Sequence, residues 1–112
     1  MMWTLLEEFK DIIKDRVIQK YEASGDNIKL RMQLFLKDGS VLCVRETVIS
    51  GEKRKYSYHW QDKHNTMIRR WDNAPDWEVE TFPHHLHVGD NVIPSYTRTL
   101  EKVLETIRKE IQ

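Results

Sequence analysis

The sequence predicts an α+β domain: an antiparallel β-sheet meander of four to five strands, bracketed by an N-terminal and a C-terminal helix. Two observations support this fold class. Apolar residues recur at spacings of three to five near both ends of the chain, whereas in the middle they alternate with polar residues. The chain has 112 residues. Because a core of that size rarely divides, we expect a single domain over residues 1–112.

The first predicted helix runs from Thr4 to about Tyr21. Its apolar residues would share one face, with charged residues between them: Leu5, Phe9, Ile12, Ile13, Val17 and Tyr21. Thr4 and Glu7 have the spacing of a capping box, in which each side chain pairs with a free backbone N–H of the first turn. The segment 24–27, Ser-Gly-Asp-Asn, is typical of a helix end.

Four strands with short connections are predicted next. Alternating or β-branched patterns indicate strands over segments 28–36, 41–49, 54–61 and 66–72. Asp38 and Gly39 between the first two form a strong hairpin signal, because glycine accepts the positive φ of such turns. We place a further edge strand around Pro83 to Val88. Consecutive strands joined in this way pair as an antiparallel meander.

The second predicted helix covers about Leu100 to Ile111, and Thr99 is its expected N-cap. Its apolar residues share one face: Leu100, Val103, Leu104, Ile107 and Ile111. Two helices packed on a sheet bury one of its faces and leave the other open to solvent or to a partner. We also expect a sheet with an open face and a free edge to pair with a second copy as a homodimer.

The composition excludes several classes of protein. Basic and acidic residues are equal in number, 18 of each, so nucleic acid could be bound only through a local basic patch. Cys43 is the only cysteine, which excludes an intrachain disulfide and a multi-cysteine zinc site. No apolar run approaches the ~20 residues of a membrane span, and the N-terminus lacks the features of a signal peptide. We therefore expect a cytoplasmic protein that does not enter a membrane.

Three histidines, His84, His85 and His87, fall within four positions. Because imidazole titrates near neutrality, such a cluster can supply both a general acid and a general base. In an extended chain His85 and His87 point to one side and His84 to the other. Two alternatives stay open: a buried structural histidine with exposed neighbours, or a metal site of His85 and His87 with Asp72 or Asp90. No spacing matches a recognised metal motif, so we expect no metal and no cofactor.

A second constellation combines aromatic and basic residues of the third and fourth predicted strands. If these strands pair, Tyr58 and Trp60 come close to Arg69 and Trp71 across the sheet. Guanidinium planes beside aromatic rings suit stacked bases and phosphate. Aromatic residues at every second position are also the usual way in which a sheet packs its core.

The basic residues raise two further points. Arg69 and Arg70 point to opposite faces, so one of them enters the covered face and needs a partner, either Asp72 or Glu46. The run 53–55, Lys-Arg-Lys, is either a solvated turn or a phosphate contact. The predicted RNA-binding set is therefore Tyr58, His59, Trp60, Arg69, Trp71, Lys53, Arg54 and Lys55.

Three ordered motifs closely resemble those of the TumE family of small prokaryotic toxins. They lie in segments 56–61, 70–75 and 82–90, and the resemblance extends from about Leu34 to Ile107. It implies a cytoplasmic toxin of a toxin–antitoxin module, neutralised by a cognate antitoxin protein, and it leaves the reaction open. The matching residues are Tyr58, His59, Trp60, Gln61, Arg70, Trp71, Asp72, Asn73, His84, His85 and His87.

With this resemblance, the residue chemistry favours a toxin that acts as a metal-independent endoribonuclease. Such cleavage needs a base for the 2′-hydroxyl, an acid for the leaving 5′-oxygen and a cation for the phosphorane charge. His84 or His85 would share the two proton transfers with His87. Arg70 would supply the cation, and Asp72 would orient a histidine or neutralise Arg70.

Stacking surfaces for the bases would come from Tyr58 and Trp60. The alternative is a non-catalytic binding module that inhibits a macromolecular target through its aromatic and arginine surface. In that case the histidine cluster would be structural.

Overall fold

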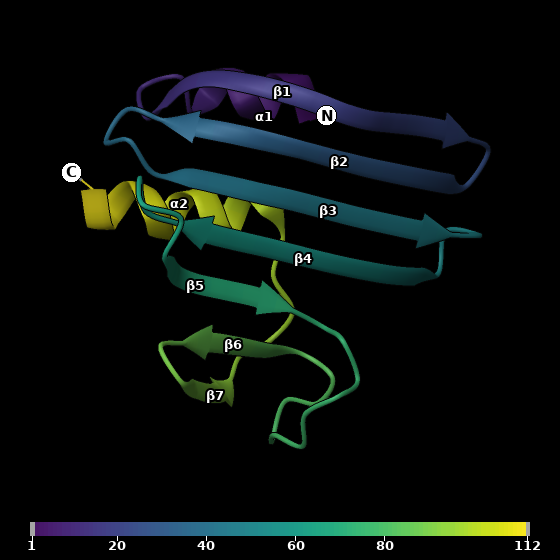
Figure 1. Cartoon of the computed structure of the whole chain (residues 1–112). Helices are drawn as coiled ribbons and strands as arrows, with labels where there is room; N and C mark the ends of the chain where they lie inside the picture. The colour runs from purple at the N-terminus through teal and green to yellow at the C-terminus, as the bar shows by residue number, and fades with distance from the viewer. Residues whose placement is uncertain (1, 112) are drawn as a thin grey trace.

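The computed structural model describes residues 2–111, which form two helices and one sheet (Figure 1). The elements follow in the order α1 (Met2–Glu8), β1 (Ile13–Ser24), β2 (Asn27–Leu36), β3 (Val41–Ile49), β4 (Lys53–Gln61), β5 (Met67–Asp72), β6 (His85–Val88), β7 (Asn91–Pro94) and α2 (Leu100–Ile111). Each strand pairs antiparallel with the next, so the sheet order is β1-β2-β3-β4-β5-β6-β7. The α+β meander is confirmed, but the sheet has seven strands rather than four to five.

The N-terminal helix is much shorter than predicted, and this accounts for one of the additional strands. α1 ends at Glu8, and residues 13–24 form β1, which pairs with β2 along its length. Val17 and Tyr21 are 46% and 49% exposed, so their helical spacing does not mark a buried face. Pairing with β2 satisfies the backbone of this β-branched segment instead. Thr4 lies inside α1 and therefore does not cap it.

The other predicted elements are confirmed with small shifts of their ends. α2 has the predicted bounds, and the Lys102 N–H donates to Thr99 Oγ1 at 3.3 Å. Gly39 has a φ of 91° in the turn between β2 and β3. The expected edge strand around 83–88 is β6, but it is not at the edge, because β7 adds a further strand beside it.

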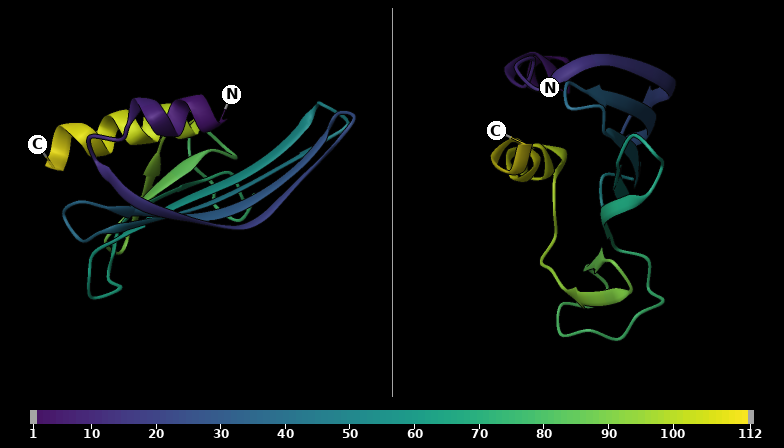
Figure 2. Two further views of the ribbon diagram at one scale, coloured as in Figure 1. Left: turned by 90° about the horizontal axis from the view of Figure 1, so that it is seen from above. Right: turned by 60° about the vertical axis from the view of Figure 1, so that its left-hand side comes forward.

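Both helices lie on the same side of the sheet (Figure 2). Between them and the sheet lies one apolar core, to which the alternate residues of β2, β3 and β4 contribute: Leu30, Met32, Leu34, Leu36, Leu42, Val44, Tyr56, Tyr58 and Trp60. Leu6 and Phe9 of the N-terminal segment and Leu104 of α2 close it from the other side. The opposite face of the sheet carries no helix, and we call it the open face.

Candidate functional site

Strand register brings the histidine cluster onto the open face beside two residues of β5. His85 is paired with Asp72 and His87 with Arg70. Arg70 is in turn paired with His59 of β4. Residues paired across antiparallel strands point to the same face. Three segments that are separate in the sequence therefore present one group of titratable side chains.

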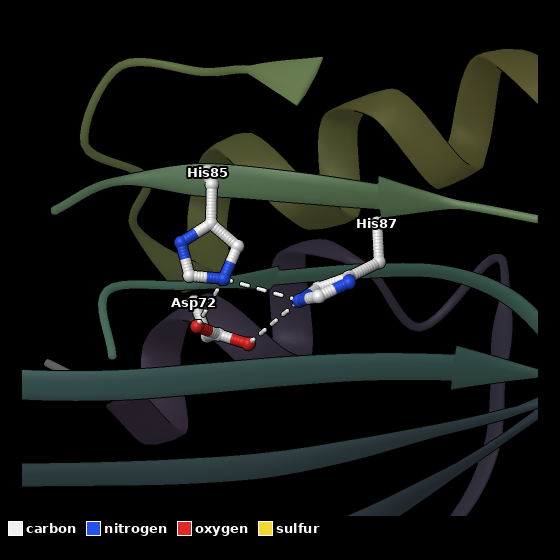
Figure 3. A group of neighbouring side chains, drawn as sticks. All are labelled: Asp72, His85 and His87. Atoms are coloured by element: carbon white, nitrogen blue, oxygen red, sulfur yellow. Dashed lines mark hydrogen bonds and ion pairs between the residues drawn. The ribbon is translucent and has the colours of Figure 1, made fainter. Parts of the chain in front are cut away.

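The centre of the site is a compact triad of Asp72, His85 and His87 (Figure 3). Nε2 of His85 lies 2.8 Å from Oδ1 of Asp72 and 3.1 Å from Nε2 of His87. Nε2 of His87 lies 3.6 Å from Oδ2 of Asp72. The side chain of His85 is fully buried, whereas that of His87 is 19% exposed. Only His87 of the two rings can meet a substrate.

Hydrogen-bond partners fix how protons are distributed in the triad. Nδ1 of His85 lies 2.9 Å from the carbonyl oxygen of Pro83, which only accepts, so Nδ1 carries a hydrogen. A neutral His85 would then turn the lone pair of Nε2 toward both a carboxylate oxygen and another ring nitrogen. That arrangement is repulsive. One proton, or another cation, must therefore be held between Asp72, His85 and His87.

Asp72 is held in place by two further donors. The Ala74 N–H donates to Oδ1 at 3.0 Å, and Nε of Arg70 donates to Oδ2 at 2.9 Å. The Asp72 side chain is only 7% exposed, whereas that of Arg70 is 40% exposed. Arg70 thus uses one edge of its guanidinium to orient the carboxylate and leaves the rest for an anion from solvent.

The environment keeps His87 neutral near pH 7. Burial lowers the pKa of His87, and the charge of Arg70 lowers it further, against the opposing effect of Asp72. Nε2 points toward His85 and Asp72, while Nδ1 lies on the far side of the ring (Figure 3). A neutral, partly exposed imidazole is suited to accept a proton.

His59 flanks Arg70 on the side away from His87. Burial and the charge of Arg70 lower the pKa of His59. Its Nδ1 is buried without a hydrogen-bond partner among residues 2–111. Two hollows of about 340 and 230 Å³ lie on this face, and Arg45, Ser57 and Arg70 line both of them. His59 lines the larger hollow and Asp72 the smaller, so Arg70 stands between two histidines at a concave surface.

A comparison with known protein families settles the class of protein. The model of the family described as Toxin TumE matches residues 3–112. The chain belongs to the TumE toxin family. No curated protein and no solved structure gives a match. Membership of a toxin family implies a cognate antitoxin as a partner. Among residues 2–111 there is no helix that is long and apolar enough to cross a membrane.

The open face of this TumE-family protein is basic although the whole chain is neutral. The register places six cations of β2 to β5 on this face: Lys29, Arg31, Arg45, Lys53, Lys55 and Arg70. Asp72 is the one carboxylate that these four strands contribute to it. The local basic patch that nucleic-acid binding requires is therefore present, and Lys53 and Lys55 of the predicted RNA-binding set belong to it.

The aromatic members of the predicted RNA-binding set lie on the other side of the sheet. Tyr58, Trp60 and Trp71 are at most 3% exposed and belong to the core beneath the helices, so bases cannot stack on them. These three rings therefore pack the core of the sheet, which was the alternative to RNA binding that the sequence left open. Of the rings near the triad, Trp77 is exposed instead, with its centroid 5.6 Å from that of His87. Trp77 is not among the residues that the sequence predicts to bind RNA.

Two arginines of that set also face the helices, where each has an acidic partner. Arg69 forms an ion pair with Glu110 of α2, rather than with Asp72 or Glu46. Arg54 contacts Glu46 at 3.2 Å and donates to the Tyr58 hydroxyl at 2.7 Å. Both guanidinium groups support the helix-covered side and are not available to RNA on the open face.

His84 does not join the other two histidines. Its ring stacks on Tyr56, with centroids 5.7 Å apart, and its Nδ1 lies 2.8 Å from the Tyr56 hydroxyl. This side chain is therefore directed away from the triad, as the alternation along an extended segment predicts. Asp90, the other acidic residue considered for a metal site, lies exposed in the turn between β6 and β7.

Arg31, Arg45 and Ser57 are site residues that the sequence analysis missed. They lie in one row across the open face, and this row continues to Asp72 and His85. These residues could have been found from the sequence, because they belong to the polar half of each alternating strand pattern and hairpin register places them side by side. In β2 and β3 the polar half was not interpreted as functional, and in β4 Ser57 was left out although Lys53, Lys55 and His59 of the same half were included.

Proposed function

We propose that this TumE-family toxin is a metal-independent endoribonuclease that binds RNA on the open face and cleaves it beside Arg70. The observation that carries the proposal is the placement of Arg70 between His59 and His87, with Asp72 holding the guanidinium in position. A phosphate on Arg70 would lie between two imidazoles, one for each proton transfer. The basic residues of β2 to β4 supply contacts for the neighbouring phosphates.

The reaction is an attack of the ribose 2′-oxygen on the adjacent phosphorus. Neutral His87 carries its hydrogen on Nε2, where it is the proton shared with Asp72 and His85, so the lone pair of Nδ1 takes the 2′-hydroxyl proton. The new P–O bond then forms, and the bond to the 5′-oxygen breaks. Protonated His59 gives its proton to that leaving oxygen, while Arg70 stabilises the charge of the phosphorane. The products are a 2′,3′-cyclic phosphate and a 5′-hydroxyl.

These roles differ from those expected from the sequence. His84 is directed to the other face and takes no part. His85 is buried and becomes a positioning residue, which acts on His87 through the triad. His59, expected only to bind RNA, takes the role of the acid. Trp77 replaces Tyr58 and Trp60 as the ring on which a base can stack.

The proposal is tested by incubating the purified protein with single-stranded RNA in the presence of EDTA. Cleavage is expected to persist in the chelator and to leave cyclic phosphate ends, which phosphatase treatment does not remove until acid opens the ring. Loss of cleavage in EDTA would contradict the metal-independent route. Absence of cleavage at any protein concentration would favour the non-catalytic binding module.

The rate of cleavage is expected to depend on pH with its maximum on the acid side of neutrality. The acid must be protonated, and the pKa of His59 is lowered by burial and by Arg70. The protonated fraction therefore declines already below the usual histidine value of ~6.5, and kcat/KM falls by about tenfold per pH unit above that pKa. Initial rates measured between about pH 5 and about pH 8.5 check this. A maximum on the alkaline side would contradict the role of His59.

The homodimer expected from the sequence stays a prediction. β1 is the edge strand at one end of the sheet, and its residues are exposed except for Ile13 and Ile18, which are half-buried. Antiparallel pairing of two β1 strands across a two-fold axis would satisfy both free edges. This contact would leave the open face of each copy accessible.

A further inference from the structure

Three groups with lone pairs converge in the triad: the Asp72 carboxylate and the rings of His85 and His87. A metal ion could occupy the place of the shared proton between them. We propose that Asp72, His85 and His87 form a binding site for one divalent transition-metal ion, with Zn²⁺ as its probe, and that the bound ion replaces the shared proton. The inference about metal binding is independent of the reaction proposed above. Its consequence for cleavage rests on that proposed function.

The spacing of the ligand atoms fits a tetrahedral ion. Metal–nitrogen bonds of ~2.0–2.1 Å place neighbouring ligand atoms ~3.3–3.4 Å apart. The two ring nitrogens lie 3.1 Å apart, whereas Asp72 approaches them through different oxygens, Oδ1 at 2.8 Å from His85 and Oδ2 at 3.6 Å from His87. With one ligand atom from each residue the three atoms lie within 4.8 Å of one another, so a turn of the carboxylate, or binding through both of its oxygens, would complete the geometry. Two imidazoles and one carboxylate suit Zn²⁺ and its neighbours, whereas Mg²⁺ and Ca²⁺ prefer oxygen ligands.

The groups around the triad already orient each ligand. The Nδ1–H of His85 donates to the carbonyl oxygen of Pro83, which leaves Nε2 as the coordinating atom. Metal-binding histidines commonly have this arrangement, because the second hydrogen bond fixes the tautomer and the ring plane. Asp72 is fixed by the Ala74 N–H and by Arg70. Ligands held in this way lose little conformational entropy when an ion binds.

The part of the chain that the structure describes holds one candidate metal site. Among residues 2–111, this is the one group of three His, Cys, Asp or Glu side chains whose ligand atoms gather closely enough, within 4.8 Å of one another. His84 is directed elsewhere, with Nδ1 bonded to the Tyr56 hydroxyl. The fourth position of a tetrahedral ion would face the exposed side of His87, where water or a phosphate oxygen can enter.

Binding of the ion would inhibit the proposed cleavage. A histidine that coordinates through Nε2 carries its remaining hydrogen on Nδ1. Nδ1 of His87 then has no lone pair for the 2′-hydroxyl proton, so Zn²⁺ and the catalytic base compete for one ring. Arg70 opposes the ion by its charge, and an RNA phosphate on Arg70 would bind more tightly once the ion is present.

The experiment uses the full chain, freed of metal by chelation, and titrates it with Zn²⁺ alone by calorimetry and with Co²⁺ by visible absorption. We expect one equivalent of Zn²⁺, a visible Co²⁺ spectrum of tetrahedral character and a rise in Tm. His87→Ala, which alters a partly exposed ring, should weaken binding at least about tenfold. His64→Ala, at an exposed turn, is the matched control and should bind as the wild type does.

Binding well below one equivalent, or equal binding by His87→Ala, would overturn the metal site. A parallel RNA assay separates the two proposals. Zn²⁺ binding without any RNA cleavage supports the metal site and overturns the ribonuclease. Cleavage without Zn²⁺ binding supports the ribonuclease and overturns the metal site. Cleavage that is accelerated by stoichiometric Zn²⁺ overturns the inhibitory role of the ion.

Discussion

Replacing His87 with alanine is expected to reduce RNA cleavage by about 10²–10⁴-fold, the usual contribution of a general base. The variant loses the partly exposed ring of the triad and keeps the cations that bind RNA. kcat should therefore fall much more than KM rises. Single-turnover cleavage of a short RNA, followed at saturating protein, measures this effect directly.

The structure also indicates that His87→Ala leaves the fold intact. His87 is partly exposed, on a four-residue strand that keeps its pairing with β5 through the backbone. Far-UV circular dichroism and Tm should remain close to those of the wild type. His64→Ala removes a histidine of the same size from an exposed turn and should keep full activity. Undiminished cleavage by a folded His87→Ala protein would exclude His87 as the base.

The variant His84→Ala tests whether His84 transfers a proton, as the sequence allows, or takes no part in cleavage, as its direction in the structure indicates. The histidines at positions 84 and 85 are equivalent candidates in the sequence, but only His85 faces the triad. Alternation along β6 already predicted that His85 and His87 share a side. Which side they share depends on the register with β5, and periodicity alone does not fix that register.

The sequence predicted most of the strands because each carries a clear alternation with one apolar face. It failed for residues 13–24, where helical spacing of Ile13, Val17 and Tyr21 coincides with a strand whose side chains are mostly exposed. An edge strand buries little, so its pattern contains little information about its partner. The extra strand β7, only four residues long, has the same weakness.

The candidate site was predicted in part for a related reason. Asp72, Arg70, His85 and His87 were all identified, since chemically reactive residue types stand out in a sequence. Tyr58, Trp60 and Trp71 were assigned to RNA because large rings occur in binding platforms and in cores alike. Their exposure depends on which face the helices cover, and that is settled by packing rather than by residue type.

Because the Asp72 side chain is almost fully buried, its loss should cost considerable stability. Its carboxylate accepts from the Ala74 N–H and Arg70, and it lies opposite the fully buried ring of His85. Asp72→Ala would leave these donors without an acceptor and the shared proton without a counter-charge. Removing one partner of a buried pair typically costs about 3–5 kcal/mol, a large share of the roughly 5–15 kcal/mol that stabilises a small domain.

Urea unfolding of Asp72→Ala, Asp72→Asn and Asp90→Ala tests this account of the triad. The amide of Asp72→Asn offers one acceptor oxygen in place of two, so it satisfies either the Ala74 N–H or Arg70 and should be intermediate in stability. Asp90 lies in an exposed turn, and its removal should change the unfolding midpoint little. Because His87 depends on Asp72 for its orientation, both Asp72 variants should also lose most RNA cleavage. If Asp72→Ala unfolds at the same urea concentration as Asp90→Ala, the carboxylate does not hold the buried proton, and the triad has no role in positioning His87.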